Sequence, residues 1–426
     1  MQAILGKLPT FVTKQQVSTN PLLALWEGRV PENHFNTPVS NQKGFLEAKP
    51  FQNTVLEGKH VKAAIVTCGG LCPGLNLVVQ ELTNALYSYG TTQVYGVLNG
   101  FKGFRNEDFL RLNPQQLETI HRDAGTVIKS SRGGWDLQSI ADSVQRNGFN
   151  HVYIIGGDGT HRGALELSKE MLCRNLAVHV CALPKTIDND IPLIASSFGF
   201  ETAVEAAVEA IECAEAETRS FQNSIGLVKV MGRHSGFIAL HAALCNRNVD
   251  ICLIPESQFD LTGEKGVIEY ALKKLQEKQR LLFVVAEGCG YSCRDEKLVT
   301  EETDASGNPL LLDICGSILS KLKESPKKPV VRFIDPSYMV RAKKPNTSDK
   351  RLCVELAQGA VHGCFGGLTG FGIGKVDSKL VYIPLEVLTT TLEGSNSQKG
   401  QRTIDPETDP FWRLFLLSSK QPSFLN

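Results

Sequence analysis

The 426-residue chain lacks the features that would place it in several specialised classes of protein. Lys plus Arg and Asp plus Glu both total 45, so the net charge is zero and neither a nucleic-acid partner nor a membrane surface is expected. No apolar run is long enough to span a bilayer, and residues 1–20 contain no signal-peptide core. We therefore expect a cytoplasmic protein. A plastid or another organelle is the alternative, because residues 1–20 carry lysine, serine and threonine but no acid.

The twelve cysteines form no C-x-x-C pair. Cys68/Cys72 and Cys289/Cys293 have a C-x3-C spacing, which falls within the looser range of zinc ligands. Most of the others lie in apolar stretches, so reduced, buried thiols are the expectation and a structural zinc is the alternative. The chain also has no Ser–His–Asp signature and no H-E-x-x-H motif, which argues against those hydrolase classes.

What is present is the composition of a globular protein, with 42% hydrophobic and 21% charged residues. A chain of this length exceeds what one core usually serves, so two domains are predicted. We place them at residues 61–200 and 201–375. An N-terminal extension, residues 1–60, precedes them, and a C-terminal segment, residues 376–426, is expected to pack back on the core.

Apolar runs of strand length alternate with helical patterns from residue 61 onward. This alternation predicts an α/β fold with two Rossmann-like parallel-sheet domains and helices on both faces. Nearly every predicted strand ends in glycine plus a charged residue, and in a parallel sheet such ends share one edge. The charged residues counted at these ends are Asp158, Asp188, Asp190, Arg233, Glu287, Arg332 and Arg341.

Two glycine-rich turns each follow a predicted strand and precede a helical pattern. Residues 68–76 read C-G-G-L-C-P-G-L-N, and residues 156–160 read G-G-D-G-T. Backbone N–H groups and a helix dipole at such a turn suit a phosphate. Asp158 suits Mg²⁺, since a carboxylate that faces phosphates needs a cation between them. The alternative is a purely structural turn with Asp158 as a helix N-cap.

Residues 183–190 read L-P-K-T-I-D-N-D. Pro184 disfavours helix at the preceding residue, so Lys185–Asp190 is predicted to leave its strand as an extended loop with Asp188 and Asp190 on one side. Either a solvated acidic turn or a site at a strand end fits this stretch alone. One of the two aspartates could accept a hydroxyl proton, and the arginines could grip a second anion. Together the residues predict a phosphotransferase that acts on a phosphorylated alcohol in a cleft along the strand ends.

Six stretches, in order and spacing, resemble the phosphofructokinase family, and within it the plant and protozoan type. They are C-G-G-L-C-P-G-L-N (68–76), G-G-D-G-T (156–160), P-K-T-I-D-N-D (184–190), M-G-R-H-S-G (231–236), A-E-G (286–288) and D-P-S-Y-M-V-R (335–341). The resemblance covers residues 61–375, and it implies a nucleotide-binding domain at 61–200 and a sugar-phosphate-binding domain at 201–375. G-G-D-G alone also occurs in NAD kinases, whereas the third and fourth stretches are specific.

The resemblance implies that ATP is the co-substrate and Mg²⁺ the cofactor, with Asp158 meeting the metal. The residues implied to bind ATP are Gly70, Arg132, Gly133, Gly157, Asp158, Gly159 and Thr160. Asp188 would take the C1 hydroxyl proton of fructose 6-phosphate, Asp190 would support the metal or orient Asp188, and Arg233 would neutralise charge on the transferred group. The residues implied to bind the sugar phosphate are Thr186, Ile187, Asp188, Met231, Gly232, Arg233, Glu287, Arg332, Tyr338, Met339, Val340 and Arg341.

Two residues of the resemblance point to different phosphoryl donors. Gly159 leaves room for the α-phosphate of ATP where pyrophosphate users carry aspartate, whereas Lys185 is also found in pyrophosphate users. ATP is the expectation, and a pyrophosphate-dependent enzyme, a catalytically silent regulatory subunit and an NAD kinase are the alternatives. A homo-oligomer, dimer or tetramer, is expected. Ser224 stands where bacterial members place an arginine that reaches a neighbouring subunit, and Lys129 stands where a glycine is common.

Overall fold

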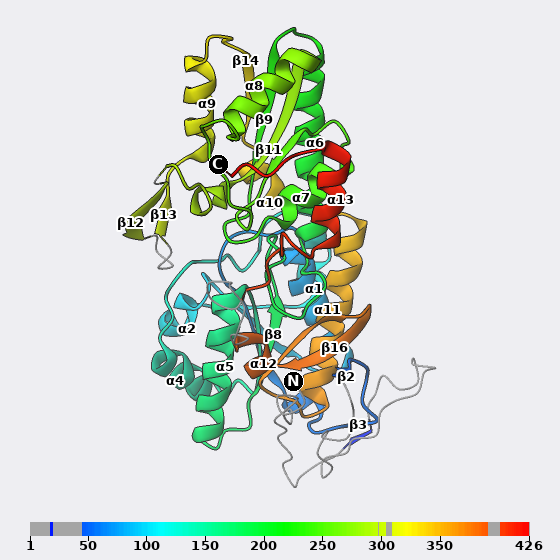
Figure 1. Cartoon of the computed structure of the whole chain (residues 1–426). Coiled ribbons are helices and arrows are strands. Elements are labelled where there is room, and N and C mark those ends of the chain that lie inside the picture. The colour runs from blue at the N-terminus through cyan, green and yellow to red at the C-terminus, as the bar shows by residue number, and fades with distance from the viewer. Residues whose placement is uncertain (1–17, 20–44, 297, 304–308, 391–400, 426) are drawn as a thin grey trace. The chain divides into compact units, whose positions relative to one another are not determined.

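The computed structural model describes residues 18–19, 45–296, 298–303, 309–390 and 401–425 (Figure 1). They form two compact units. The first unit takes the described residues within 1–186, 191–199 and 342–400, and the second takes those within 187–190, 200–341 and 401–426. Most of the predicted N-terminal extension, residues 1–17 and 20–44, lies outside the described residues.

The first unit is built on an eight-stranded sheet with the order β2-β16-β15-β8-β7-β4-β5-β6. The strands from β15 to β5 in this order run parallel, whereas β6, β16 and β2 join by antiparallel pairing, so the sheet is mixed rather than purely parallel as expected. The bounds are β2 Leu46–Glu47, β4 Lys62–Thr67, β5 Gln93–Val97, β6 Phe109–Arg111, β7 His151–Gly156, β8 His179–Pro184, β15 Phe371–Val376 and β16 Lys379–Pro384. A separate short pair joins β1 (Ser18–Thr19) and β3 (Asn53–Thr54).

Helices cover both faces of this sheet, which explains why β4, β7 and β8 read as continuous apolar runs. Alternate residues, such as Ala64, Val152 and Val180, belong to one core cluster with side chains of α4, α5 and α12. On the other face, α1 packs on α11, which also contacts β8, β15 and β16. The helix bounds are α1 Leu75–Ser88, α2 Lys102–Asn106, α3 Pro114–Leu117, α4 Leu137–Asn147, α5 Asp158–Cys173, α11 Thr347–Phe365 and α12 Leu385–Thr389.

The second unit contains a four-stranded sheet with the order β10-β11-β9-β14, and all of its neighbours are parallel. Helices α6, α7 and α8 pack on the sheet, and α9 packs on α8. The strands are β9 Ser224–Val230, β10 Ile251–Leu253, β11 Arg280–Ala286 and β14 Val330–Ile334, with a hairpin of β12 Val299–Thr303 and β13 Pro309–Leu311. The helices are α6 Phe200–Arg219, α7 Phe237–Cys245, α8 Val267–Lys278, α9 Ile314–Glu324, α10 Ser337–Arg341 and α13 Pro410–Ser419.

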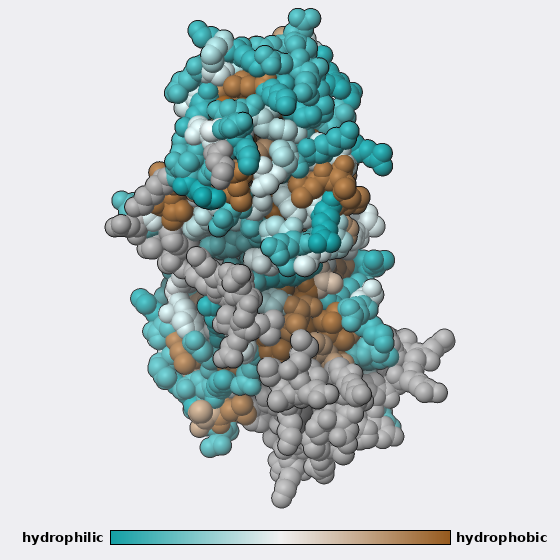
Figure 2. Space-filling view, in the orientation of Figure 1, coloured by the Kyte–Doolittle hydropathy of each residue, from teal (hydrophilic) through white to brown (hydrophobic). Residues whose placement is uncertain are grey.

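The observed division differs from the predicted boundary at residue 375. The chain returns to the first unit at Ala342, because α11 packs on α1 and β15 pairs with β8. The predicted C-terminal segment is itself divided, since residues 376–390 complete the first sheet and residues 401–425 belong to the second unit. Its helix α13 leaves Phe411, Leu414 and Leu417 exposed, and Figure 2 shows the apolar surface over this helix.

Candidate functional site

Three turns of the first unit meet at the carboxyl ends of the neighbouring strands β4, β7 and β8. The N–H of Cys68 donates to the carbonyl of Ile155 at 2.8 Å, and the N–H of Lys185 donates to the carbonyl of Gly156 at 2.9 Å. The buried ammonium of Lys185 reaches back to the first turn and donates to the carbonyl of Gly70 at 2.9 Å. The structure therefore brings together Gly70, the G-G-D-G-T turn and Lys185, as their positions at strand ends predicted.

Helix α5 begins inside the G-G-D-G-T turn. Gly157 is its N-cap and Asp158 its first residue, so the N–H groups of Asp158 and Gly159 lie at the start of the helix and suit an anion, whereas those of Thr160 and His161 donate to the carbonyl of Gly157. A Cβ added at Gly159 would meet no atom within 4 Å, and one added at Gly157 would come only to 3.6 Å from the carbonyl oxygen of Lys185. The protein itself does not need glycine at these positions, which favours a ligand as the reason for them.

Asp158 forms an ion pair with Arg162, one helical turn along α5. No group of three or more potential His, Cys, Asp or Glu ligands occurs among the described residues. Mg²⁺ does not require such a cage, because it is usually held by one or two carboxylates together with substrate phosphates and water. A single carboxylate at the start of a phosphate-binding helix therefore fits Mg²⁺ delivered with a nucleotide.

Arg132 lies on a loop that runs alongside the first glycine turn. Ser130 Oγ donates to the carbonyl of Gly69 at 2.7 Å, and Ser131 forms an isolated parallel bridge with Cys68. Arg132 is exposed, and Gly133 beside it has a φ of +70°, which glycine adopts readily. Lys129 on the same loop has a φ of +59°, a conformation that favours glycine, and this explains why the position commonly carries one.

In the second unit, the loops after β9 and β11 pack backbone against backbone. The N–H of Gly288 donates to the carbonyl of Gly232 at 3.0 Å, and a Cβ at Gly288 would lie 1.9 Å from the carbonyl oxygen of Arg233. This close approach sets Glu287 beside Arg233. Burial raises the pKa of Glu287, while the positive charges of Lys229 and Arg233 oppose that rise. The structure thus brings together Met231, Gly232, Arg233 and Glu287.

The chain passes from the first unit to the second between Thr186 and Ile187. The following loop is fastened by its backbone, since Ser235 Oγ donates to the carbonyl of Asp188 at 2.9 Å and the N–H of Arg402 donates to the carbonyl of Asp190 at 2.8 Å. Asp188 is half-buried and Asp190 is 8% exposed. A solvated acidic turn does not describe this loop.

The predicted sugar-phosphate residues in and after β14 differ from one another in exposure and position. Tyr338 and Met339 are exposed, and the guanidinium of Arg341 lies 4.9 Å from the Tyr338 ring centroid, but Val340 is fully buried, so its side chain cannot contact a substrate. Arg332 is not at the strand end. It lies in the middle of β14, level with Gly226 of β9, and pairs with Glu217 at 3.3 Å while its guanidinium covers the Phe221 ring at 4.7 Å.

The four cysteines of the two C-x3-C spacings form no disulfide among the described residues. Cys68, Cys72, Cys289 and Cys293 are all buried, and the Sγ of Cys72 donates to the carbonyl of Phe198 at 3.1 Å. Burial raises the pKa of Cys68 to about 12, so that thiol stays protonated. These observations favour small buried hydrophobic residues over zinc ligands. Ser224 is also buried, with its Oγ donating to the carbonyl of Thr218 at 2.8 Å.

Sequence reasoning missed two residues that the structure ties to the predicted site. Glu256 accepts hydrogen bonds from the N–H groups of Gly236 at 3.0 Å and Ile404 at 2.9 Å. Gln401 donates its side-chain amide to Asp190 Oδ2 at 3.1 Å. Neither residue stands in a glycine-rich strand end, which was the signal that found the others.

One unit offers a helix N-terminus to an anion, and the other holds two carboxylates on a fastened loop. These two features are typical of a phosphotransferase. Comparison with known proteins narrows that class. The family model described as Phosphofructokinase matches residues 62–364, and the chain belongs to this family.

The relatives and solved structures agree with this membership. The chain is 45% identical over 387 residues to the Arabidopsis thaliana protein "ATP-dependent 6-phosphofructokinase 1", covering 89% of this chain and 80% of that one. It is 37% identical to the "ATP-dependent 6-phosphofructokinase" of Entamoeba histolytica, covering 82% of each. The solved structure of a pyrophosphate-dependent phosphofructokinase from Marinobacter aquaeolei superimposes with a TM-score of 0.68 at 16% identity, covering 85% of this chain and 92% of that one, which supports the fold alone. The predicted resemblance to the plant and protozoan type is confirmed.

Proposed function

We propose that this chain transfers the γ-phosphoryl group of ATP to the C1 hydroxyl of fructose 6-phosphate and forms fructose 1,6-bisphosphate. Relatives that match most of the chain at 37–46% identity carry the name ATP-dependent 6-phosphofructokinase. The observation in this chain that carries the choice of donor is the open space at Gly159, where no atom stands within 4 Å of an added Cβ. A nucleotide phosphate can approach the backbone there, and an aspartate side chain would occupy that space and repel it.

The residues divide between the two units according to the two substrates. In the first unit, the start of α5 and the turn at Gly70 would bind the nucleotide phosphates, with Arg132 and Gly133 beside them. Asp158 would hold Mg²⁺, which supplies charge neutralisation on the phosphates when bound. Because Asp158 already pairs with Arg162, metal binding would exchange that partner. That Asp158 and Asp188 share one cavity stays a prediction.

In the second unit, Asp188 would accept the proton of the attacking hydroxyl, and Asp190 would orient the Asp188 carboxylate. Arg233 would stabilise the charge of the transferred group, which dominates catalysis in phosphoryl transfer. Glu287 would hold a sugar hydroxyl, since it follows β11 directly and lies beside Arg233, and Tyr338 and Arg341 on α10 would hold the 6-phosphate. Arg332 has no such role in our proposal, because Glu217 and Phe221 engage it within this unit.

A coupled assay with each donor at saturating fructose 6-phosphate tests the proposal. We expect turnover with Mg-ATP and little with Mg-pyrophosphate. Turnover with pyrophosphate alone would reject the choice of donor in spite of Gly159. Absence of turnover with both donors would favour the silent regulatory subunit, and phosphorylation of NAD would favour the NAD kinase alternative.

We further propose a homo-oligomer. The edge strand β14 exposes Val330 and Phe333, and an exposed apolar edge strand offers a template for pairing with another chain. Light scattering would give the mass directly. Among the helices of the described ranges, none combines the length and hydropathy that crossing a bilayer requires. The compartment stays a prediction, since some relatives are named chloroplastic and others are not.

A further inference from the structure

The described C-terminal segment, residues 401–425, lies beyond residues 62–364 that the family model matches, and it belongs to the second unit. It passes through α13, whose Trp412 and Phe415 are buried, and ends against the edge strand β10. There the side chain of Gln421 accepts from the N–H of Cys252 at 2.8 Å and donates to its carbonyl at 3.1 Å. The segment is therefore built into the unit.

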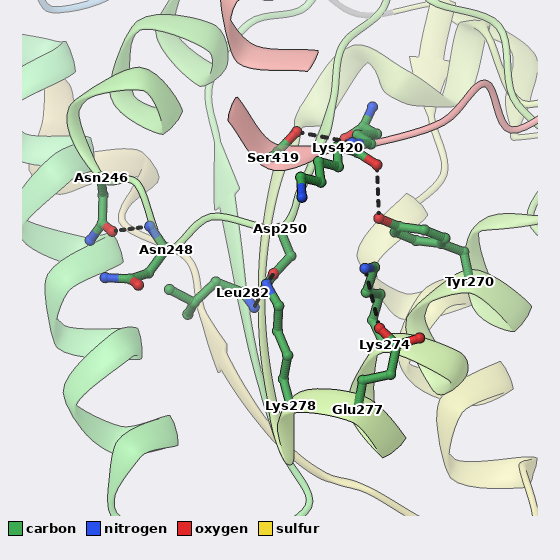
Figure 3. Close-up of polar contacts among 11 residues, drawn as sticks. Asn246, Asn248, Asp250, Tyr270, Lys274, Glu277, Lys278, Leu282, Ser419 and Lys420 are labelled. Atoms are coloured by element: carbon green, nitrogen blue, oxygen red, sulfur yellow. Dashed lines mark hydrogen bonds and ion pairs between the residues drawn. The ribbon is translucent and has the colours of Figure 1, made fainter. Parts of the chain in front are cut away.

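Figure 3 shows another anchor of this segment, where the chain leaves α13. The hydroxyl of Tyr270 on α8 donates to the carbonyl of Lys420 at 3.2 Å. The ring of Tyr270 also packs edge-on against Phe424, with centroids 5.4 Å apart. These contacts fix the far end of the segment, so its first residues have a defined place.

Those first residues, Gln401–Ile404, are here called the C-terminal strap. The strap grips Asp190 by both its side chain and its backbone. The amide of Gln401 donates to the carboxylate at 3.1 Å, and the N–H of Arg402 donates to the carbonyl of the same residue at 2.8 Å. The guanidinium of Arg402 lies over the ring of Phe237 at 4.6 Å, which holds the strap to the start of α7.

Glu256 connects the strap to the loop that carries Arg233. One of its oxygens accepts from the N–H of Ile404 at 2.9 Å and from that of Gly236 at 3.0 Å. Ser235, next in the chain to Gly236, donates its hydroxyl to the carbonyl of Asp188 at 2.9 Å. The loop of Asp188 and Asp190 is thus fastened on one side by residues 235–236 and on the other by the strap, and Glu256 joins the two fasteners.

One end of the Gln401 amide serves no contact among the described residues. Its Oε1 is buried and has no hydrogen-bond partner in that part of the chain, although buried polar atoms are nearly always paired. An amide whose purpose was only to stabilise the fold would have both ends satisfied. The open acceptor therefore suggests that this amide also faces a group that the described chain does not supply.

We propose that the C-terminal strap is a positioning element for phosphoryl transfer, in which the Gln401 amide sets the orientation of the Asp190 carboxylate. This inference rests on the proposed function, because it assigns Asp190 to the reaction. Gln401 is a positioning residue and need not touch the substrate. Its contribution is expected in kcat, because a misoriented carboxylate impairs the transition state more than substrate binding.

The test compares Gln401→Leu, which removes the amide at similar size, with the matched control Gln421→Leu in the same segment. For Gln401→Leu we expect kcat to fall about tenfold while KM for both substrates changes by less than about threefold. Gln421→Leu should lower the Tm and leave kcat at 25 °C unchanged. Gln401→Asn, which retains an amide donor on a shorter side chain, should recover part of the lost kcat.

Hydrogen exchange of the peptide around residues 187–190 gives a readout independent of activity, and it should quicken in Gln401→Leu but not in Gln421→Leu. A Gln401→Leu variant with wild-type kcat and unchanged exchange would overturn the inference. So would a variant that loses kcat only in proportion to a fall in Tm, since that result assigns a merely structural role. A wild-type protein inactive with both donors would instead reject the proposed function, and the exchange experiment would still decide whether the strap holds the loop.

Discussion

A Cβ added at Gly159 in the first unit meets no atom within 4 Å, whereas one added at Gly288 in the second would lie 1.9 Å from the carbonyl oxygen of Arg233. Glycine is therefore present at these two positions for two different physical reasons. At Gly159, in the first turn of α5, glycine is dispensable to the fold and leaves room for a phosphate. In the loops after β9 and β11, glycine is required because two stretches of backbone approach each other closely.

The acidic residues of the two units differ in the same way. Asp158 pairs with Arg162 four residues along its own helix, so little besides that helix fixes its side chain. Asp190 accepts from Gln401, which is 211 positions away in sequence. The carboxylate on the proposed nucleotide side is thus held by a local contact, and the carboxylate on the proposed sugar side is held by a long-range contact. The second arrangement suits a carboxylate that must be positioned before the substrate arrives.

The largest expected effect comes from Asp188→Asn, which keeps the shape of the fastened loop and removes the carboxylate proposed as the base. We expect kcat to fall by roughly a hundred- to ten-thousandfold, with the affinity for fructose 6-phosphate largely retained. Coupled assays and calorimetric titration give the two quantities. The control is Asp377→Asn, the same chemical change in an exposed turn. If Asp188→Asn turned over normally, the division into a nucleotide side and a catalytic sugar side would be wrong.

Gly288→Ala tests whether the sugar-side glycines are structural. The added methyl must displace backbone, which costs on the order of 3 kcal/mol of folding free energy. A fall in Tm should therefore accompany any loss of activity. The matched change is Gly157→Ala in the first unit, where the added carbon makes only ordinary contact at 3.6 Å and the Tm should stay nearly constant. Equal loss of stability in both variants would erase the contrast between the two sets of glycines.

Gly159→Asp tests whether the open space at the start of α5 receives the phosphates of the nucleotide. We expect ATP turnover to fall by about a hundredfold, because a carboxylate then faces the nucleotide phosphates. The Tm should not fall, since the space is open and the position lies in the first turn of α5, where an acid is favourable. Gly159→Ala separates charge from size and should retain most of the ATP turnover. Unimpaired ATP use by the aspartate variant would contradict the assignment of this turn to the nucleotide.

The sequence predicted the parts of the site that are local. Apolar runs that end in glycines or in charged residues located the turns after β4, β7, β8, β9 and β11, because neighbouring residues determine both the strand and its turn. Arg332 was counted among the residues at strand ends, although it lies in the middle of β14 (Val330–Ile334). The antiparallel additions at the edges of the first sheet were missed because β2 and β6 are too short to show a period.

Glu256 and Gln401 could not be found in this way. Glu256 meets Ile404 across 148 positions, and no local pattern distinguishes it from any other loop carboxylate. Its function becomes visible only when the fold brings the strap, the end of β10 and the start of α7 together. The contacts that fasten the loop of Asp188 and Asp190 therefore depend on tertiary structure, whereas the regular motifs of the sequence indicated only local turns.

The smallest expected effect concerns the pH dependence of these fastening contacts. Burial raises the pKa of Glu256 to about 7, although the N–H groups of Ile404 and Gly236 oppose the rise, and Asp409 adds to it. The folded state therefore holds a proton that the unfolded chain releases near its ordinary pKa of 4.5. The contribution of this proton to stability is complete below that value and is lost as the pH rises through 7, because the folded protein then contains a buried charge.

Glu256→Gln keeps an oxygen acceptor for both N–H groups and cannot ionise. At pH 4 its Tm should match that of the wild type, and at pH 8 it should exceed it by an amount equivalent to about 3 kcal/mol. The raised pKa of Glu287 acts in both proteins and cancels in the comparison. Thermal unfolding at the two pH values measures the difference. A Tm difference that is the same at both pH values would mean that Glu256 is ionised throughout, and that the strap is fastened by a charge rather than by a neutral carboxyl.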